Sequence, residues 1–477
     1  MGLKRNIIYN LLYQTATLFL PLITVPYISR VLGPSGVGLQ AFTLSVVDYF
    51  LLIGTLGLSM YGTREIAYSR DNPQELAKTF WNVLIIRIIC LTSAFLLYGV
   101  FVSFVNSNKL AFMIQSLLII SSLLDISWFF LGIEEIKLVL VRGMLLRILS
   151  IVFIFIFIKS PADTNRYILL TASLPLAVNI SLFLKLKHYN LTFSPLKWVS
   201  FIFHLKRSLA LFIPQIATQI YLVLDKTMLG VFTTIEQVGY YNQAEKLVKT
   251  VLALVTSINI VLLPRMSNMF AKQEQRAMDR MMNLTLVVVT TITLPMSIGM
   301  ALVGGDFLDI FLGGGFEASK PVLLILSSLI FLISISSVTG TQYLLPSNRM
   351  KAYTSSVALG AIVNFLLNLL LIPKHGAIGA AIGSLAAEAS VTTTQIIFTR
   401  KAISLKLNLP QFSQSIIASL LMTVVILALK QYLPVMGVTL VIIQVLAGSV
   451  IYLGFLLVLK NPTMITLLNS ILKKYNS

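Results

Sequence analysis

A stripe of small polar and acidic side chains interrupts one of the apolar runs of this sequence. Ser45, Asp48, Thr55 and Ser59 are spaced by 3, 7 and 4 residues between positions 38 and 61, so on a helix they share one face. Ionisable groups inside an apolar helix are costly and usually face a partner or a water-filled cavity. Such a face suits the binding of a polar solute. Hydrogen bonding between packed helices is the alternative, and we favour the lining of a cavity.

Three further polar stripes lie on related apolar runs. When the sequence is shifted by 201 residues along itself, the first polar stripe falls on a second stripe that carries lysines. The apolar runs at 7–29 and 208–232 each contain one further polar stripe. Together with two arginines inside other runs, these stripes give the predicted substrate-binding lining: Gln14, Asp48, Thr55, Arg87, Arg147, Gln215, Thr218, Asp225, Lys226, Lys246, Lys249 and Thr256.

The ionisable residues outside the stripes allow two interpretations each. Arg87 and Arg147 lie inward of the cytoplasmic edge of their runs, where an arginine either extends to the interface or contacts a diphosphate. Asp125 and Glu388 are isolated in apolar runs, where each serves as a cation-coupling carboxylate or meets a buried structural partner.

Residues at the ends of the apolar runs are interpreted as lying at the edges of the membrane rather than in a binding site. Arg30, Arg64 and Arg265 stand there and are interpreted as gate or cytoplasmic-edge residues. Trp128 and Trp198 also lie at run edges, where tryptophan is a common interface anchor. The histidines and the single cysteine have no metal-ligand spacing, and no nucleotide-binding motif is present. We therefore predict no catalytic residues, no metal and no cofactor, and a protein that is not an enzyme.

The elements that position these residues follow from composition. The chain has 477 residues, of which 57% are hydrophobic and 11% are charged, against about 25% charged in a soluble domain. Its mean hydropathy is +0.89, and apolar runs long enough to cross a bilayer recur throughout. The predicted fold is an all-α polytopic membrane protein with about 14 transmembrane helices. The predicted spans are 7–29, 38–61, 80–104, 110–132, 138–158, 166–185, 208–232, 244–264, 282–303, 320–345, 351–372, 376–399, 413–433 and 437–459.

The distribution of basic residues orients these spans. With the N-terminus inside, 24 of the 36 Lys and Arg residues fall in cytoplasmic segments and 7 in outer loops. Because cytoplasmic loops carry the excess of positive charge, the bias favours an even number of spans with both termini in the cytoplasm. It also accounts for most of the net charge of +19, for which no nucleic-acid partner is needed.

The shift of 201 residues reveals an internal repeat. The segment Gln14 to Thr17 falls on Gln215 to Thr218, and Val37-Gly38 falls on Val238-Gly239. Six predicted spans separate the two copies, so both have the same orientation in the membrane. Parallel repeats of this kind build transporters whose substrate site lies between the halves.

Four motifs give the chain a family resemblance. They are "RVLGPSGVG" at 30–38, "YGTREIA" at 61–67, "VGYYNQAEKL" at 238–247 and "LNLLLIPKHGAIGAAIGS" at 367–384. In their order and spacing, the chain resembles the polysaccharide-transporter branch (Wzx-type flippases) of the multidrug/oligosaccharidyl-lipid/polysaccharide exporter superfamily. Relatives that flip the peptidoglycan precursor carry arginines in the middle of the first span. This chain has none between Arg5 and Arg30, which disfavours that substrate.

The resemblance implies two pseudo-symmetric lobes around a central cavity and alternating access. It also implies a substrate, an undecaprenyl-diphosphate-linked oligosaccharide moved from the inner to the outer leaflet of the bacterial cytoplasmic membrane, for capsule or another cell-surface polysaccharide. The expected partners are this lipid, membrane lipids, a polysaccharide polymerase and other export proteins. The domains predicted are an N-terminal lobe at 1–185, a basic cytoplasmic linker at 186–207, a C-terminal lobe at 208–400, and spans 13 and 14 with a cytoplasmic tail at 401–477.

Two other functions remain open at the level of sequence. A multidrug/cation antiporter of the same superfamily would share the fold, although the positive charges inside the spans suit an anionic substrate better than a cationic one. A membrane polysaccharide polymerase or glycosyltransferase would belong to a different class, and it is expected to need a large outer loop or a cluster of acidic residues. The outer loops here are short.

Overall fold

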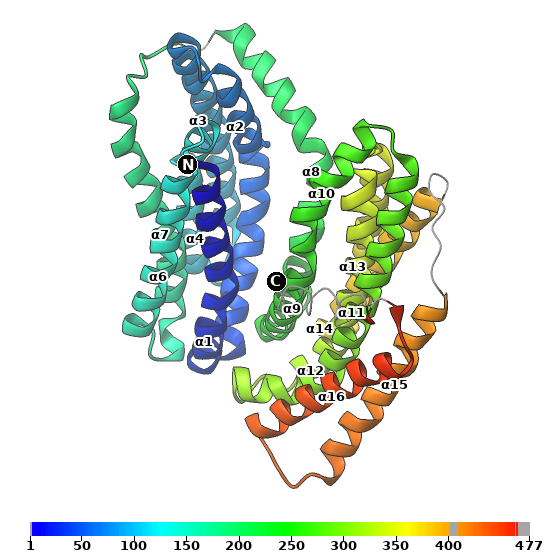
Figure 1. Ribbon diagram of the computed structural model, residues 1–477. Helices are drawn as coiled ribbons and strands as arrows, with labels where there is room; N and C mark the ends of the chain where they lie inside the picture. Colours follow the sequence, from blue (N-terminus) through cyan, green and yellow to red (C-terminus); the bar gives the residue numbers. More distant parts are fainter. Residues whose placement is uncertain (1, 196, 401–408, 463, 466–477) are drawn as a thin grey trace. The chain divides into compact units, whose positions relative to one another are not determined.

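In the computed structural model, the described residues form helices joined by loops and turns (Figure 1). The structure covers the backbone of residues 2–195, 197–400, 409–462 and 464–465, and within these the side chains of all but residues 2–19, 211, 213–215, 217, 218, 220–222, 258, 260 and 261. The chain divides into two compact units, Met1–Gly239 and Tyr240–Ser477. The boundary falls inside helix α9 (Ile235–Thr256). The division into lobes at the 186–207 linker stays a prediction.

The first unit contains eight helices and the start of α9 among its described residues. They are α1 (Gly2–Thr55), α2 (Leu58–Ser69), α3 (Pro73–Phe104), α4 (Lys109–Leu123), α5 (Ser127–Gly132), α6 (Ile136–Phe157), α7 (Thr164–Leu186) and α8 (Trp198–Phe232), with short 3₁₀ turns η1 (Pro161–Asp163) and η2 (Lys187–Tyr189).

The second unit continues from α9 through helices of 8 to 51 residues. They are α10 (Ile258–Ala271), α11 (Gln275–Leu312), α12 (Ser319–Leu326), α13 (Ser328–Ser336), the π-helix η3 (Ser337–Leu344), α14 (Met350–Arg400), α15 (Leu409–Tyr432) and α16 (Val438–Val458).

Local sequence explains where several helices begin and turn. Asn72 accepts hydrogen bonds from the backbone N–H groups of Gln74 and Glu75, at 3.1 and 3.3 Å, and so caps α3, which opens on a proline. Helix α1 is two helices joined at Gly33, whose φ of 68° and ψ of −177° are non-helical. Its ribbon turns back on itself in Figure 1. Helix α14 is divided in the same way at Gly376.

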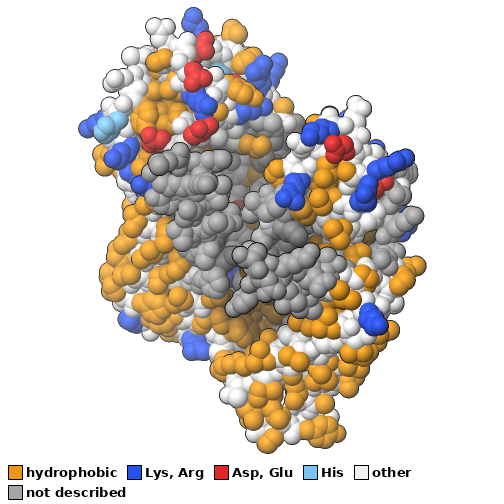
Figure 2. Space-filling view, viewed as in Figure 1, with side chains coloured by type: hydrophobic (Ala, Val, Ile, Leu, Met, Phe, Trp, Pro, Cys, Tyr) orange, Lys and Arg blue, Asp and Glu red, His pale blue; other side chains and the backbone are white. Residues whose placement is uncertain are grey.

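The predicted fold class is confirmed. In the described residues, ten helices are long and apolar enough to span a membrane, and two of them, Leu20–Ser69 and Met350–Arg400, contain the divisions just described. In the view of Figure 2, hydrophobic side chains cover much of the surface, whereas most Lys and Arg side chains gather in its upper part. The exact count of fourteen spans stays a prediction.

An aromatic cluster forms the core at one end of the first unit. Tyr61, Phe80, Trp128, Phe129 and Phe130 are its largest members, and the Phe80 and Trp128 rings stack at 5.5 Å. Only 1% of Trp128 is exposed, so its prediction as an interface anchor is wrong: the short helix α5 turns it inward. Trp198, at the start of α8, is 72% exposed, as an interfacial side chain would be.

Candidate functional site

A polar cavity of about 370 Å³ lies within the first unit. Asp48 and Thr55 of α1 and Ser59 of α2 line it, together with Phe212 and Gln219 of α8. Three members of the predicted polar stripe thus share one cavity, and apart from Gln219 the rest of its lining is apolar. Such a mixture of apolar walls and a few convergent polar groups is typical of a site for a polar ligand.

A break between α1 and α2 opens this cavity. Leu56 and Gly57 both have positive φ, 43° and 72°, so the predicted span 38–61 contains a break: the helix ends at Thr55 and restarts at Leu58. The hydroxyl of Ser208 donates to the Leu56 carbonyl at 2.6 Å, which satisfies one of the backbone groups that the break frees. Non-helical backbone at membrane depth is tolerated where it is buried in protein or lines a cavity.

Arg87 holds one wall of the polar cavity from behind. Its Nη1 donates to the Ser59 hydroxyl at 2.8 Å, and its Nε donates to the Ser122 carbonyl at 2.9 Å. Its Nη2 reaches the Ser122 hydroxyl at 3.2 Å and Asp125 Oδ2 at 3.3 Å. Only 1% of Arg87 is exposed. The guanidinium is therefore held inside the unit rather than at the interface, and it positions Ser59, a cavity residue. Its contact with a diphosphate stays a prediction.

Asp125 meets a structural partner, which is one of the two alternatives that the sequence left open. Besides its ion pair with Arg87, its Oδ1 accepts from the backbone N–H of Ser127 at 2.9 Å. Because the carboxylate has a cationic partner and a helix-end contact, its negative charge is compensated. Sequence reasoning missed Ser122, which lies 35 residues from Arg87 in the chain; its only signal was a serine close before an acidic residue.

Asp48 has a charged neighbour on α8. Lys226 exerts an attractive Coulombic interaction on its carboxylate, and Asp225 beside it is buried. One turn before Asp48, the Ser45 hydroxyl accepts from Thr227 at 2.9 Å. These contacts bring together the second half of α1 and α8, each of which carries one of the predicted polar stripes.

The remaining predicted site residues are dispersed. The side chains of Gln14, Gln215 and Thr218 lie outside the described residues. In the second unit, Lys249 pairs with Glu245 at 2.6 Å, Lys246 is partly buried, and Thr256 donates to the Leu252 carbonyl at 3.0 Å.

The predicted arginines other than Arg87 also lie apart from one another and from the polar cavity. Arg30 and Arg265 are exposed, and Arg147 is partly buried on α6. Arg64 pairs with Glu65 at 3.0 Å and lies over the Tyr61 ring at 5.5 Å. None of these four lines the polar cavity as the described residues define it.

Glu388 lies in a buried polar network of the second unit. It is 6% exposed, and its Oε1 accepts from the Ser336 hydroxyl at 2.8 Å. Ser336 directly precedes the π-helix η3, whose Thr339 donates to Gln395 at 3.1 Å. π-helical turns often occur at functional sites. A buried carboxylate held by a hydroxyl is suited to exchange a proton or to bind a cation.

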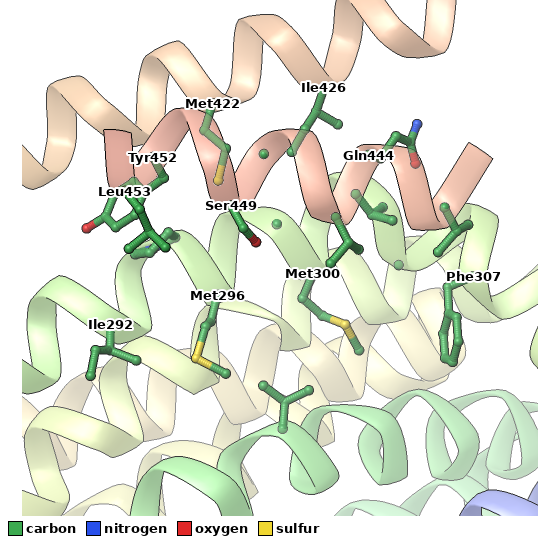
Figure 3. Close-up of a pocket in the computed structure, with 18 of the residues that line it drawn as sticks. Ile292, Met296, Met300, Phe307, Met422, Ile426, Gln444, Ser449, Tyr452 and Leu453 are labelled. Atoms are coloured by element: carbon green, nitrogen blue, oxygen red, sulfur yellow. The ribbon is translucent and has the colours of Figure 1, made fainter. Parts of the chain in front are cut away.

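A second cavity, of about 460 Å³, is largely apolar and lies between α11, α15 and α16. Figure 3 shows Met296 and Met300 of α11 facing Ser449 and Leu453 of α16 across it. Methionine side chains are flexible and polarisable, and so adapt to apolar ligands of varied shape. We refer to this site as the apolar cavity.

The fold resembles those of solved membrane transporters. A structure titled "Lipid II flippase MurJ, inward closed conformation" matches with a TM-score of 0.78 at 18% identity, over 94% of this chain and 98% of the other. An inward-facing multidrug resistance MATE family transporter of the MOP superfamily matches with a TM-score of 0.62 at 13% identity, over 80% and 95%. At sequence identities below 20%, these similarities show the fold alone, which is that of a multi-pass helical membrane protein.

Sequence comparison then defines the family. The family model "Polysaccharide biosynthesis protein" matches residues 3–270, so the chain belongs to the polysaccharide biosynthesis protein family. A "Putative O-antigen transporter" of Escherichia coli (strain K12) is 27% identical over 417 residues, covering 84% of this chain and 97% of the relative.

Proposed function

We propose that this protein is a flippase that moves an undecaprenyl-diphosphate-linked oligosaccharide from the inner to the outer leaflet of the bacterial cytoplasmic membrane, by alternating access, for capsule or another surface polysaccharide. The observation that carries the proposal is the similarity to a putative O-antigen transporter along nearly the whole length of that relative. Both termini are cytoplasmic in this proposal, and a polysaccharide polymerase receives the product.

The two cavities suit the two parts of such a substrate. Sugar hydroxyls and a diphosphate lose several kcal/mol per unpaired group in hydrocarbon, on the order of 2–7 kcal/mol for a hydroxyl. The polar cavity offers Asp48, Thr55 and Ser59 as replacements for water, and Lys226 adds positive charge near Asp48. The apolar cavity with its methionines suits an isoprenoid tail, which would stay in an apolar setting while the head crosses.

Glu388 is the coupling carboxylate in this proposal. The Asp125 charge is compensated by Arg87, whereas the hydrogen bond that the structure gives Glu388 comes from a neutral serine. Gain of a proton or cation at Glu388 in one conformational state, and its loss in the other, would tie transport to an ion gradient.

Genetic complementation tests the proposed function. The gene is expressed in cells that lack their own flippase for a lipid-linked surface glycan, and the glycan at the cell surface is measured. Restored surface glycan supports a flippase. Efflux of cationic dyes without restored glycan would favour the multidrug antiporter, whose fold neighbour has a TM-score of 0.62.

A further inference from the structure

Two equivalent glycines of the repeat, Gly38 and Gly239, lie against each other's helix. Gly38, just after the turn in α1, is buried against the start of α9. A Cβ atom added to Gly38 would overlap the carbonyl oxygen of Ile235 and would stand 2.9 Å from the backbone nitrogen of Gly239. The two backbones therefore meet with no room for a side chain.

The contact is reciprocal. A Cβ atom added to Gly239 would overlap the carbonyl oxygen of Pro34 and would stand 3.2 Å from the Pro34 Cα. The repeat shift of 201 residues converts Pro34 into Ile235 and Gly38 into Gly239. Each copy thus contributes the same glycine and the same carbonyl position, which is the pattern of a two-fold interface. Spacing identified the repeat, but only the structure shows that its equivalent positions touch.

The position of this contact along α1, relative to the polar cavity, indicates what the contact does. Asp48 and Thr55 follow Gly38 on the same helix by 10 and 17 residues, roughly 15 and 26 Å at the helical rise. The polar cavity therefore lies further along α1, away from the Gly33 turn that the charge distribution places outside. All four contacting residues and the cavity belong to the first unit.

We infer that Gly38 and Gly239 form an outer seal, in which backbone-to-backbone contact closes the polar cavity from the outer face and separates when the substrate is released. Glycine is required on both sides because a methyl group would hold the two helix backbones apart. This inference rests on the proposed alternating access, although the contact itself does not depend on which substrate is carried.

Cysteine accessibility tests the seal. Leu52, a cavity residue, is changed to cysteine in a Cys90→Ala background, and a membrane-impermeant maleimide is added from outside. Overpacking at either glycine should raise the labelling rate about tenfold in Gly38→Ala and in Gly239→Ala. Gly99→Ala is the matched control, because a Cβ at this helical glycine meets nothing within 4 Å; its labelling should equal that of the parent.

A gentler pair of variants gives a second measurement. Val37 and Val238 are equivalent by the shift and buried beside the glycines, and Val→Cys changes little volume. If the seal opens, both cysteines should label from outside in cells that export glycan. Two results would overturn the inference: alanine variants that label no faster than Gly99→Ala, or cysteines at 37 and 238 that stay unlabelled, as expected of a permanent packing seam. Accelerated labelling in a protein that exports no glycan would retain the seal and reject the proposed function.

Discussion

Arg87 shows how a charged side chain inside a span is stabilised by the residues around it. It is almost fully buried, and Ser59, Ser122 and Asp125 accept its hydrogen bonds. A buried ion pair is costly to break from one side, by about 3–5 kcal/mol, because the remaining charge is left without a partner. Arg87 therefore contributes to the cavity through the position of Ser59.

We expect Arg87→Ala to lower the melting temperature of the purified protein and to reduce surface expression. Arg87→Lys should recover part of the loss, because lysine keeps the charge but not the forked geometry. Arg70→Ala is the control, since Arg70 pairs with Glu134 at an exposed site; it should melt near the wild-type temperature. A normal melting temperature for Arg87→Ala, together with lost export, would instead indicate direct contact with substrate.

His204 predicts a pH dependence of stability. It lies at the start of α8, with Nδ1 2.6 Å from the Tyr61 hydroxyl and Nε2 3.3 Å from the Asn82 amide nitrogen. Burial lowers the pKa of His204 from its ordinary value near 6.5, with an opposing contribution from Glu65. The unfolded chain thus binds a proton at a higher pH than the folded one. The stabilisation is complete above pH 6.5 and is lost as the pH falls through the folded pKa.

The measurement is thermal unfolding of the wild type and of His204→Gln between pH 8 and pH 5. The wild type should lose more stability than the variant below pH 6.5, because only the wild type must protonate a buried imidazole. Parallel curves for the two proteins would show that His204 does not titrate in this way.

At the scale of elements, interruptions in helices mark the places where polar groups are used. The break at Leu56 and Gly57 opens the polar cavity, and the π-helix η3 follows the serine that holds Glu388. Regular helices satisfy all their backbone groups internally, so irregular backbone is retained in a span only where packing or a cavity supports it.

We expect Glu388→Gln to fold normally and to lower the rate of glycan export at least about fivefold. This factor is the lower end of the range that coupling between two sites typically produces. Glutamine keeps the shape of the side chain and its hydrogen bond with Ser336, but it cannot exchange a proton. Export in the variant should also stop responding to pH or to sodium. Glu317→Gln, at an exposed site in the same unit, is the control. Unchanged export and unchanged ion response in Glu388→Gln would remove this residue from coupling.

The spacing of residues in the sequence predicts the parts of the candidate site that lie on one helix, but not the contacts that depend on tertiary packing. The spacing of 7 predicts a shared face for Asp48 and Thr55, because both lie on one continuous helix. Ser59 lies beyond the break, on α2, so its place in the same cavity depends on the turn at Leu56 and Gly57 and not on helical spacing. The partners of Arg87 could not be predicted, since Ser122 and Asp125 lie 35 and 38 residues away and reach it only through tertiary packing. Nor does a leucine-glycine pair in an apolar run distinguish a helix break from a continuous span. Trp128 was misplaced because burial depends on how α5 turns.

At the scale of the whole molecule, the charge distribution predicts topology. Excess Lys and Arg in alternate loops favours a cytoplasmic position for both termini. A reporter that is active only inside the cell, fused after Ser477, should therefore be active. The same fusion with a reporter that is active only outside should be silent, and activity of that second reporter would contradict the predicted orientation.

Translocation in reconstituted vesicles tests the central claim most directly. The purified protein is incorporated into vesicles that carry an undecaprenyl-diphosphate-linked oligosaccharide in both leaflets, and a glycan-cleaving enzyme is added outside. Protein-free vesicles should release only the glycan of their outer leaflet. With the protein present, we expect the inner-leaflet glycan to become accessible and cleavage to approach completion. Cleavage that stops at the protein-free level, or lengthening of the glycan by the protein itself, would contradict the flippase account.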